Sequence, residues 1–202
     1  MNELLKLTLV ELTEALQKRK ASPVELMEAV LARIDETHAD LNAVVAMRDR
    51  QALLRDAHAT EERITRGEAR PLEGVPLGVK ALEDVEGLVT SQGSLPFRNH
   101  VATRDSTQVA RLRAAGAIVV GKTNAPEFGY SPITKNLVYG VTRSPWNLER
   151  TPGGSSGPCL RTRAAVASPL AHILVGLRYI SPWQVRSSVY ARTSSMALSA
   201  CR

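Results

Sequence analysis

Apolar side chains recur at helical spacing through most of the first 70 residues. An amphipathic stretch occupies positions 1–18, and a second one places five apolar side chains on one face with charged ones opposite: Leu26, Met27, Val30, Leu31 and Ile34. A third, strongly charged stretch runs from about Asp49 to Arg66 and stops at Gly67. These patterns predict a helical region over about residues 1–70 that packs on another layer and carries no chemistry.

Capping residues mark the starts of the first two helices. Thr8 with Glu11, and Ser22 with Glu25, have the spacing of capping boxes, and Pro23 occupies the favoured first position of a helix. We therefore expect helices to begin directly after Thr8 and Ser22.

The pattern changes at residue 71 to short apolar runs bounded by Gly and Pro. "GVPLGVK" (residues 74–80) and the β-branched "AIVVGKT" (117–123) are typical of buried strands. Between them lies "STQVARLRAAG", an amphipathic helix with Ser106 as its N-cap and Gly116 as its stop. A strand, a crossover helix and a strand predict a parallel, right-handed βαβ unit that is buried on both faces. The fold class is therefore α/β.

Two features of this region could carry chemistry. Lys80 ends the first apolar run, where it is either a solvated cation at a strand end or a lysine held at the edge of the core. The loop "TPGGSSG" (residues 151–157) places two hydroxyls among glycines, whose N–H groups can face an anion, although an isolated loop of this kind also suits a linker. A phosphate-binding P-loop is excluded because no lysine follows at the required spacing. The four histidines are scattered, so the sequence predicts neither a metal site nor a local Ser-His-Asp arrangement.

Charge and cysteine content narrow the class of protein. Residues 1–157 hold 20 Lys+Arg and 20 Asp+Glu, whereas residues 158–202 hold six Arg, no Lys and no acidic residue. The net charge of +6 therefore belongs to the tail, and no basic helix or aromatic-spaced basic ladder accompanies it, so we expect no nucleic-acid partner. The two cysteines, Cys159 and Cys201, are too few to predict a disulfide framework. No apolar stretch approaches the roughly 20 residues of a membrane span, so we expect a cytoplasmic protein without a membrane partner.

Three phrases in this order resemble the amidase signature family: "PLEGVPLGVKALEDVEGLVTSQGS", "DSTQVARLRAAGAIVVGKTNAPEFG" and "TKNLVYGVTRSPWNLERTPGGSSG". The resemblance covers roughly residues 5–157. It implies a mixed β-sheet sandwiched by helices, of which this chain has the first part. It also implies hydrolysis of small-molecule amides, or transfer of ammonia, through a Lys–Ser–Ser triad without a metal or cofactor, in a chain that can form a homodimer.

The resemblance assigns catalytic residues by position. Lys80 matches the triad lysine, and Ser155 matches the bridging serine, which the family holds through a cis peptide bond. Ser156 is a candidate for substrate binding, while Asn136 and the "TSQGS" stretch (residues 90–94) are candidates to support the site or are bonded within their own loops.

The chain also departs from the family pattern. Ala81 stands where relatives usually carry Asp after the lysine. Relatives place the nucleophilic serine in an Asp-x-Gly-Gly-Ser segment about two dozen residues after the bridging serine, but here Arg178, Tyr179 and Ile180 occupy that location. Ser181 is close in number but lacks the glycines that would build an oxyanion hole. We therefore assign no nucleophile in this chain.

The tail has an unusual composition that suggests a shifted reading frame. Its 45 residues contain Arg and Ser but no Lys, Asp or Glu. We therefore predict that residues 1–157 are the N-terminal portion of an amidase signature domain and that 158–202 are a divergent, out-of-frame tail. The function is then an amidase by descent, inactive in this truncated chain. The alternatives are a fragment of a glutamyl-tRNA amidotransferase A-type subunit, or a non-catalytic interaction fragment.

Overall fold

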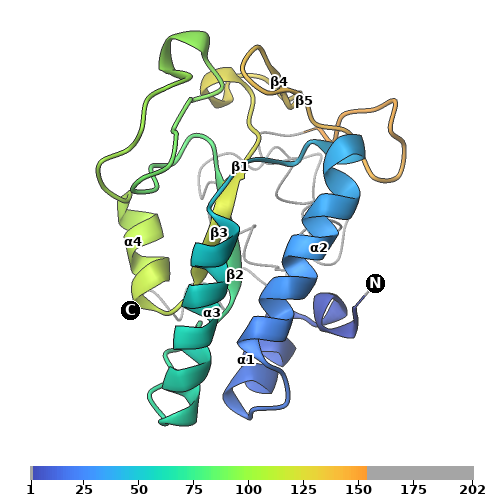
Figure 1. Cartoon of the computed structure of the whole chain (residues 1–202). Coiled ribbons are helices and arrows are strands. Elements are labelled where there is room, and N and C mark those ends of the chain that lie inside the picture. Colours follow the sequence, from blue (N-terminus) through green and yellow to red (C-terminus); the bar gives the residue numbers. More distant parts are fainter. Residues whose placement is uncertain (1, 154–202) are drawn as a thin grey trace, which may run out of the picture.

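The computed structural model describes residues 2–153, and its N-terminal part is helical (Figure 1). A short 3-10 helix η1 (Glu3–Lys6) precedes α1 (Leu9–Gln17), α2 (Pro23–Leu41) and α3 (Arg50–Thr65). The predicted helical region is confirmed, with one exception. A strand, β1 (Val44–Met47), lies between α2 and α3 and was not predicted.

The helix caps follow the sequence closely. The Thr8 hydroxyl accepts from the Glu11 N–H at 3.3 Å, and the Glu11 carboxylate accepts from the Thr8 N–H at 2.7 Å, so the first capping box is complete. Only half of the second forms: Ser22 Oγ accepts from the Glu25 N–H at 3.3 Å, and Glu25 itself is exposed. The Ser22 hydroxyl instead donates a 2.6 Å hydrogen bond to Glu61 of α3, so this cap also joins two helices.

The predicted βαβ unit is present. Strand β2 (Pro76–Lys80), helix α4 (Thr107–Ala114) and strand β3 (Ile118–Thr123) follow in that order, and the two strands are parallel. Every residue of both strands is buried, as a parallel strand pair requires. Ser106 is the N-cap residue of α4, but its hydroxyl makes no capping hydrogen bond.

The sheet is mixed because β1 joins β3 on its other edge. The strand order is β1-β3-β2, with β1 antiparallel and β2 parallel to the central β3. This arrangement confirms the α/β class and the mixed sheet that the family resemblance implies. The four residues of β1 are all apolar, so the sequence shows no alternation of apolar and polar residues there.

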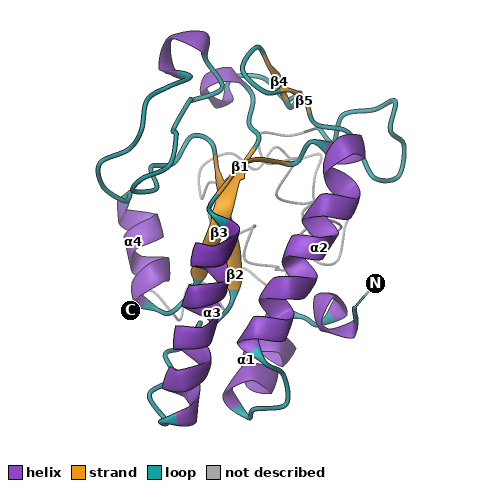
Figure 2. Ribbon diagram, in the orientation of Figure 1, coloured by secondary structure: helices purple, strands orange, loops and turns teal. Residues whose placement is uncertain are grey.

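Helices α2 and α3 lie side by side in front of the sheet, and α4 lies along its other flank (Figures 1 and 2). The core is formed by apolar side chains from all of these layers, among them Leu12, Leu16, Leu26, Met27, Leu53, Leu77, Val79, Val109 and Val119. Burial of this apolar surface is the main force that holds the helices on the sheet.

Irregular segments gather beyond the carboxyl ends of β2 and β3, at the top of Figure 1. They include η2 (Leu95–Phe97), η3 (Glu127–Gly129) and a two-stranded hairpin of β4 (Lys135–Asn136) and β5 (Gly140–Val141). Within residues 2–153, none of the helices has the length and apolar character needed to cross a membrane.

Candidate active site

Lys80 is the last residue of β2 and lies at the edge of the core. Only 5% of its surface is exposed. Of the two alternatives for this lysine, a solvated cation or a residue held at the edge of the core, the structure shows the second. The strand register pairs it with Thr123, the last residue of β3, and the N–H of Ala81 donates to the Thr123 carbonyl at 2.9 Å. The carboxyl ends of two parallel strands therefore fix the backbone on both sides of the lysine.

The stretch 90–94 packs directly on the turn that follows Lys80. The side-chain amide of Gln92 donates to the carbonyl of Leu82 at 3.1 Å, and its backbone N–H donates to the carbonyl of Ala81 at 3.3 Å. Thr90, Ser91 and Ser94 are almost fully buried. The structure thus brings this segment beside Lys80, where it can support the site.

A second buried lysine, which is not among the predicted site residues, lies one residue before Thr123. Lys122 is fully buried, and its ammonium donates to the carbonyl of Glu83 and lies 3.5 Å from the Thr90 hydroxyl. Burial lowers the pKa of Lys122 to about 8, although the negative charges of Asp84, Glu83 and Asp105 act in the opposite direction. A lysine inside a β-branched run was the only signal in the sequence.

The two lysines lie on opposite faces of the sheet. The register pairs Lys80 with Thr123 and Val79 with Lys122, and side chains alternate between faces along each strand. Lys122 therefore holds the segment after β2 in place from the other side of the sheet, while Lys80 shares the face of Thr123.

A buried network of amide and hydroxyl groups fixes the β4–β5 hairpin to the end of β3. Asn124, the residue after β3, donates to the Thr142 hydroxyl at 3.0 Å and accepts from the Asn136 amide at 2.6 Å. The Thr142 hydroxyl in turn donates to the carbonyl of Asn42, the C-cap of α2, at 2.7 Å. Asn136 is therefore part of the support around the strand ends, and the chain runs from this anchor toward the glycine-serine loop.

The remaining predicted site residues lie outside the part that the structure describes. Gly153 is the last described residue, so Ser155, Ser156, the expected cis bond, the nucleophile position and residues 158–202 stay predictions. Within residues 2–153 no group of three His, Cys, Asp or Glu side chains is arranged to hold a metal ion.

Comparisons with known proteins identify the family. Residues 25–176 match the Amidase family, so the match extends past Gly157 and stops before Tyr179. The A-type subunit of glutamyl-tRNA(Gln) amidotransferase from Roseiflexus sp. (strain RS-1) is 40% identical over 169 residues, which cover 84% of this chain and 34% of that protein. This chain spans about one third of the length of the curated relatives it matches.

Solved structures agree with this assignment. A bacterial aryl acylamidase that belongs to the amidase signature enzymes superposes with a TM-score of 0.72 and 29% identity, over 78% of this chain and 33% of that one. A structure described as a vestigial protein complex that reveals the origins of an s-triazine catabolic enzyme gives a TM-score of 0.74 and 36% identity, over 79% and 36%. The order of the sequence phrases, the mixed sheet and these matches agree, and the chain belongs to the amidase signature family.

Proposed function

We propose that this chain carries the lysine and the bridging serine of a Lys–Ser–Ser amidase site. The observation that supports this most is the burial of Lys80 at the carboxyl end of β2, where β3 fixes the backbone around it. A lysine can accept a proton near neutral pH only where burial disfavours its charged form, and a solvated strand end would not provide that environment.

The chemistry of the complete site follows from these residue types. Lys80 acts as the general base, and Ser155 passes a proton from the nucleophilic serine to it. The nucleophile attacks the amide carbonyl, the amine leaves with a proton, and water then cleaves the acyl-enzyme. Glycine N–H groups before the nucleophile stabilise the negative charge on the carbonyl oxygen, which is usually the largest electrostatic contribution to such a reaction.

This chain does not itself hydrolyse amides under the proposal. The location expected for the nucleophile holds Arg178, Tyr179 and Ile180, and Ser181 lacks the two preceding glycines. Without a serine beside an oxyanion hole, the base and the bridging serine have no acyl acceptor to activate. The absence of the nucleophile, and a shifted reading frame as its cause, are both part of this proposal.

A second candidate is the A-type subunit of a tRNA-dependent amidotransferase. The 40% identity with the Roseiflexus protein supports it, and it requires a serine of this chain to act as the nucleophile that releases ammonia from an amide donor. The test is to replace the A-type subunit by this chain in the reconstituted amidotransferase and to measure conversion of Glu-tRNA(Gln) into Gln-tRNA(Gln). Product formed above that of the complex without its A-type subunit would support this candidate.

The proposal is tested by measuring hydrolysis of 4-nitroacetanilide by the purified chain and by its Lys80→Met variant. We expect both proteins to release 4-nitroaniline at the rate of buffer alone. Release by the wild type that Lys80→Met abolishes would show an active amidase, and it would refute the claim that the nucleophile is missing.

A further inference from the structure

A cleft of about 150 Å³ lies at the end of the sheet opposite Lys80. It is formed between α3, the turn before β2 and the first residues of β3, and its lining includes Arg48, Asp56, Thr60, Arg63, Arg70 and Ile118. Ile118 begins β3, whereas Thr123 beside Lys80 ends it, so roughly 16 Å of strand separates the two sites. We call this site the arginine cleft.

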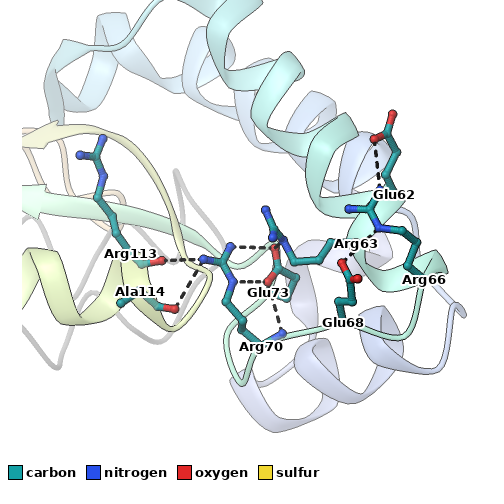
Figure 3. Close-up of polar contacts among 8 residues, drawn as sticks. All are labelled: Glu62, Arg63, Arg66, Glu68, Arg70, Glu73, Arg113 and Ala114. Atoms are coloured by element: carbon teal, nitrogen blue, oxygen red, sulfur yellow. Dashed lines mark hydrogen bonds and ion pairs between the residues drawn. The ribbon is translucent and has the colours of Figure 1, made fainter.

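Arg63 has donor groups that the protein does not use. Its Nε is buried and has no hydrogen-bond partner among the described residues, although it lies 3.3 Å from the Glu73 carboxylate (Figure 3). No other polar contact of its guanidinium is present within residues 2–153. A buried polar nitrogen without a partner is rare in native proteins and often marks the site of a water or an ion.

The neighbouring groups point to the same kind of ligand. Within residues 2–153, Arg48 uses only Nη1, which contacts Asp56 at 2.9 Å and the Val119 carbonyl at 3.0 Å. The Thr60 hydroxyl makes no hydrogen bond with the described residues, although Thr60 is almost fully buried. Unused guanidinium N–H groups and one hydroxyl therefore line the same small cleft.

The charges of the cleft do not cancel. Arg70 makes the hydrogen bonds to Glu73, 2.5 Å from Nε and 3.0 Å from Nη2, and Arg63 adds an ion pair at 3.3 Å (Figure 3). Arg48 is paired with Asp56. Arg63 is thus the third positive charge beside two carboxylates, and the cleft keeps one uncompensated positive charge. The fourth arginine of the lining, Arg113, is neutralised by Asp105, 3.0 Å away.

We propose that the arginine cleft binds a small tetrahedral oxyanion of the phosphate class, either inorganic phosphate or the phosphate group of a small monoester. Guanidinium groups present paired donors that match two oxygens of such an anion, and the Thr60 hydroxyl supplies a further donor. The volume exceeds the ~15 Å³ that a single water molecule requires, so several waters or one such anion fit. This site is independent of the amidase proposal.

The test is a titration of the full chain with inorganic phosphate at constant ionic strength, followed by isothermal calorimetry. We expect saturable binding to the wild type and at least about tenfold weaker binding to Arg63→Gln. Arg66→Gln is the matched control, because Arg66 lies on the same helix end, contacts Glu62 and Glu68, and does not line the cleft. It should bind phosphate with the affinity of the wild type.

A second variant keeps the proposal testable if Arg63→Gln does not fold. Thr60→Val preserves the shape of the buried side chain, removes only the hydroxyl, and should weaken binding several-fold. A parallel titration with phenyl phosphate separates the two ligand types, since tighter binding than inorganic phosphate identifies a monoester. The proposal is overturned if phosphate does not saturate the wild type, or if Arg66→Gln loses as much affinity as Arg63→Gln.

Discussion

The side-chain amide of Asn136 donates a 2.6 Å hydrogen bond to the carboxamide oxygen of Asn124, and both residues are buried. This bond joins the β4–β5 hairpin to the residue that follows β3. Because β3 also holds the backbone beside Lys80, the hairpin and the lysine share one rigid support. The segment that leads to the glycine-serine loop therefore starts from a fixed point beside the candidate active site.

Replacing Asn136 by Ala should destabilise the protein. The change removes donors to Asn124 and to the Ala125 carbonyl, and it leaves the N–H groups of Val138 and Tyr139 without their acceptor. We expect a loss of about 2–4 kcal/mol in the free energy of unfolding, measured by urea denaturation.

The control for this prediction is Asn147→Ala. Asn147 is exposed and its side chain accepts a single hydrogen bond, from the Glu149 N–H, so the loss should stay below about 1 kcal/mol. Equal losses for the two variants would show that the buried network around Asn136 contributes nothing beyond one ordinary loop contact.

Lys122 should make stability increase with pH above neutrality. Its pKa is about 8 in the folded protein against 10.5 when unperturbed, because burial disfavours the charged form. Between these two values the folded chain releases a proton that the unfolded chain still binds, so rising pH favours folding. The free energy of unfolding of the wild type should rise by up to about 3 kcal/mol relative to Lys122→Met from pH 8 to pH 10.5.

The matched control is Lys135→Met, which removes an exposed lysine. This variant should follow the pH dependence of the wild type over the same interval. Chemical denaturation at several pH values provides the measurement. If Lys122→Met also parallels the wild type, the buried ammonium has the proton affinity of an exposed one and this prediction is wrong.

Glu73 should stabilise the protein mainly above acidic pH. Burial alone would raise the pKa of Glu73, but the hydrogen bonds and charge of Arg70 outweigh it and hold the pKa below its usual value of 4.5. The stabilisation is therefore present above pH 4.5 and is lost as the pH falls through the lower pKa of the folded state. Glu73→Gln should cost about 2 kcal/mol at pH 7, and the difference from the wild type should shrink in acid.

Glu62 provides the comparison for this substitution. It is exposed and lies 3.8 Å from Arg66, so Glu62→Gln should change the free energy of unfolding by less than about 0.5 kcal/mol. Thermal or urea unfolding at pH 7 and at pH 4 measures both variants. A pH-independent difference between Glu73→Gln and the wild type would contradict the depressed pKa.

Gly116 is required by the close approach of the turn before β2. Its φ is +105°, and a Cβ there would lie 2.7 Å from the Cα of Glu73. At Gly67, φ is +77° and a Cβ would meet nothing within 4 Å, so alanine there suffers backbone strain alone. Gly116→Ala should lower the free energy of unfolding more than Gly67→Ala by at least about 1 kcal/mol, and equal effects in a thermal melt would refute the close packing.

The sequence predicted those features whose cause is local. Helix starts depend on residues a few positions apart, and the apolar runs that end at Lys80 and Thr123 show buried parallel strands directly. The four-residue strand β1 forms only because the edge of β3 is available to pair with it, which is a long-range cause that its own residues do not display. The hydrogen bond from the Ser22 hydroxyl to Glu61 in the next helix is likewise a long-range contact, which the residues around Ser22 do not display.

The candidate site also contains residues that the sequence could predict and residues that it could not. Lys80 could be found because it ends an apolar run, and the family resemblance then assigned its role. The burial of Lys122 could not be predicted from the sequence. It depends on Glu83 and Thr90, which lie in the connection between β2 and β3 and contact the lysine only in the folded chain. The bond between Asn124 and Asn136 likewise depends on the hairpin turning back onto the end of β3.

The most direct test of the central claim is to label the purified chain with a fluorophosphonate probe, which reacts with activated serines, and to map the label by mass spectrometry. If the chain carries Lys80 and a bridging serine but lacks a nucleophile, no serine should be labelled above the level of the heat-denatured protein. Labelling of Ser155, Ser156 or Ser181 that disappears in Lys80→Met would show a working nucleophile and would contradict the account.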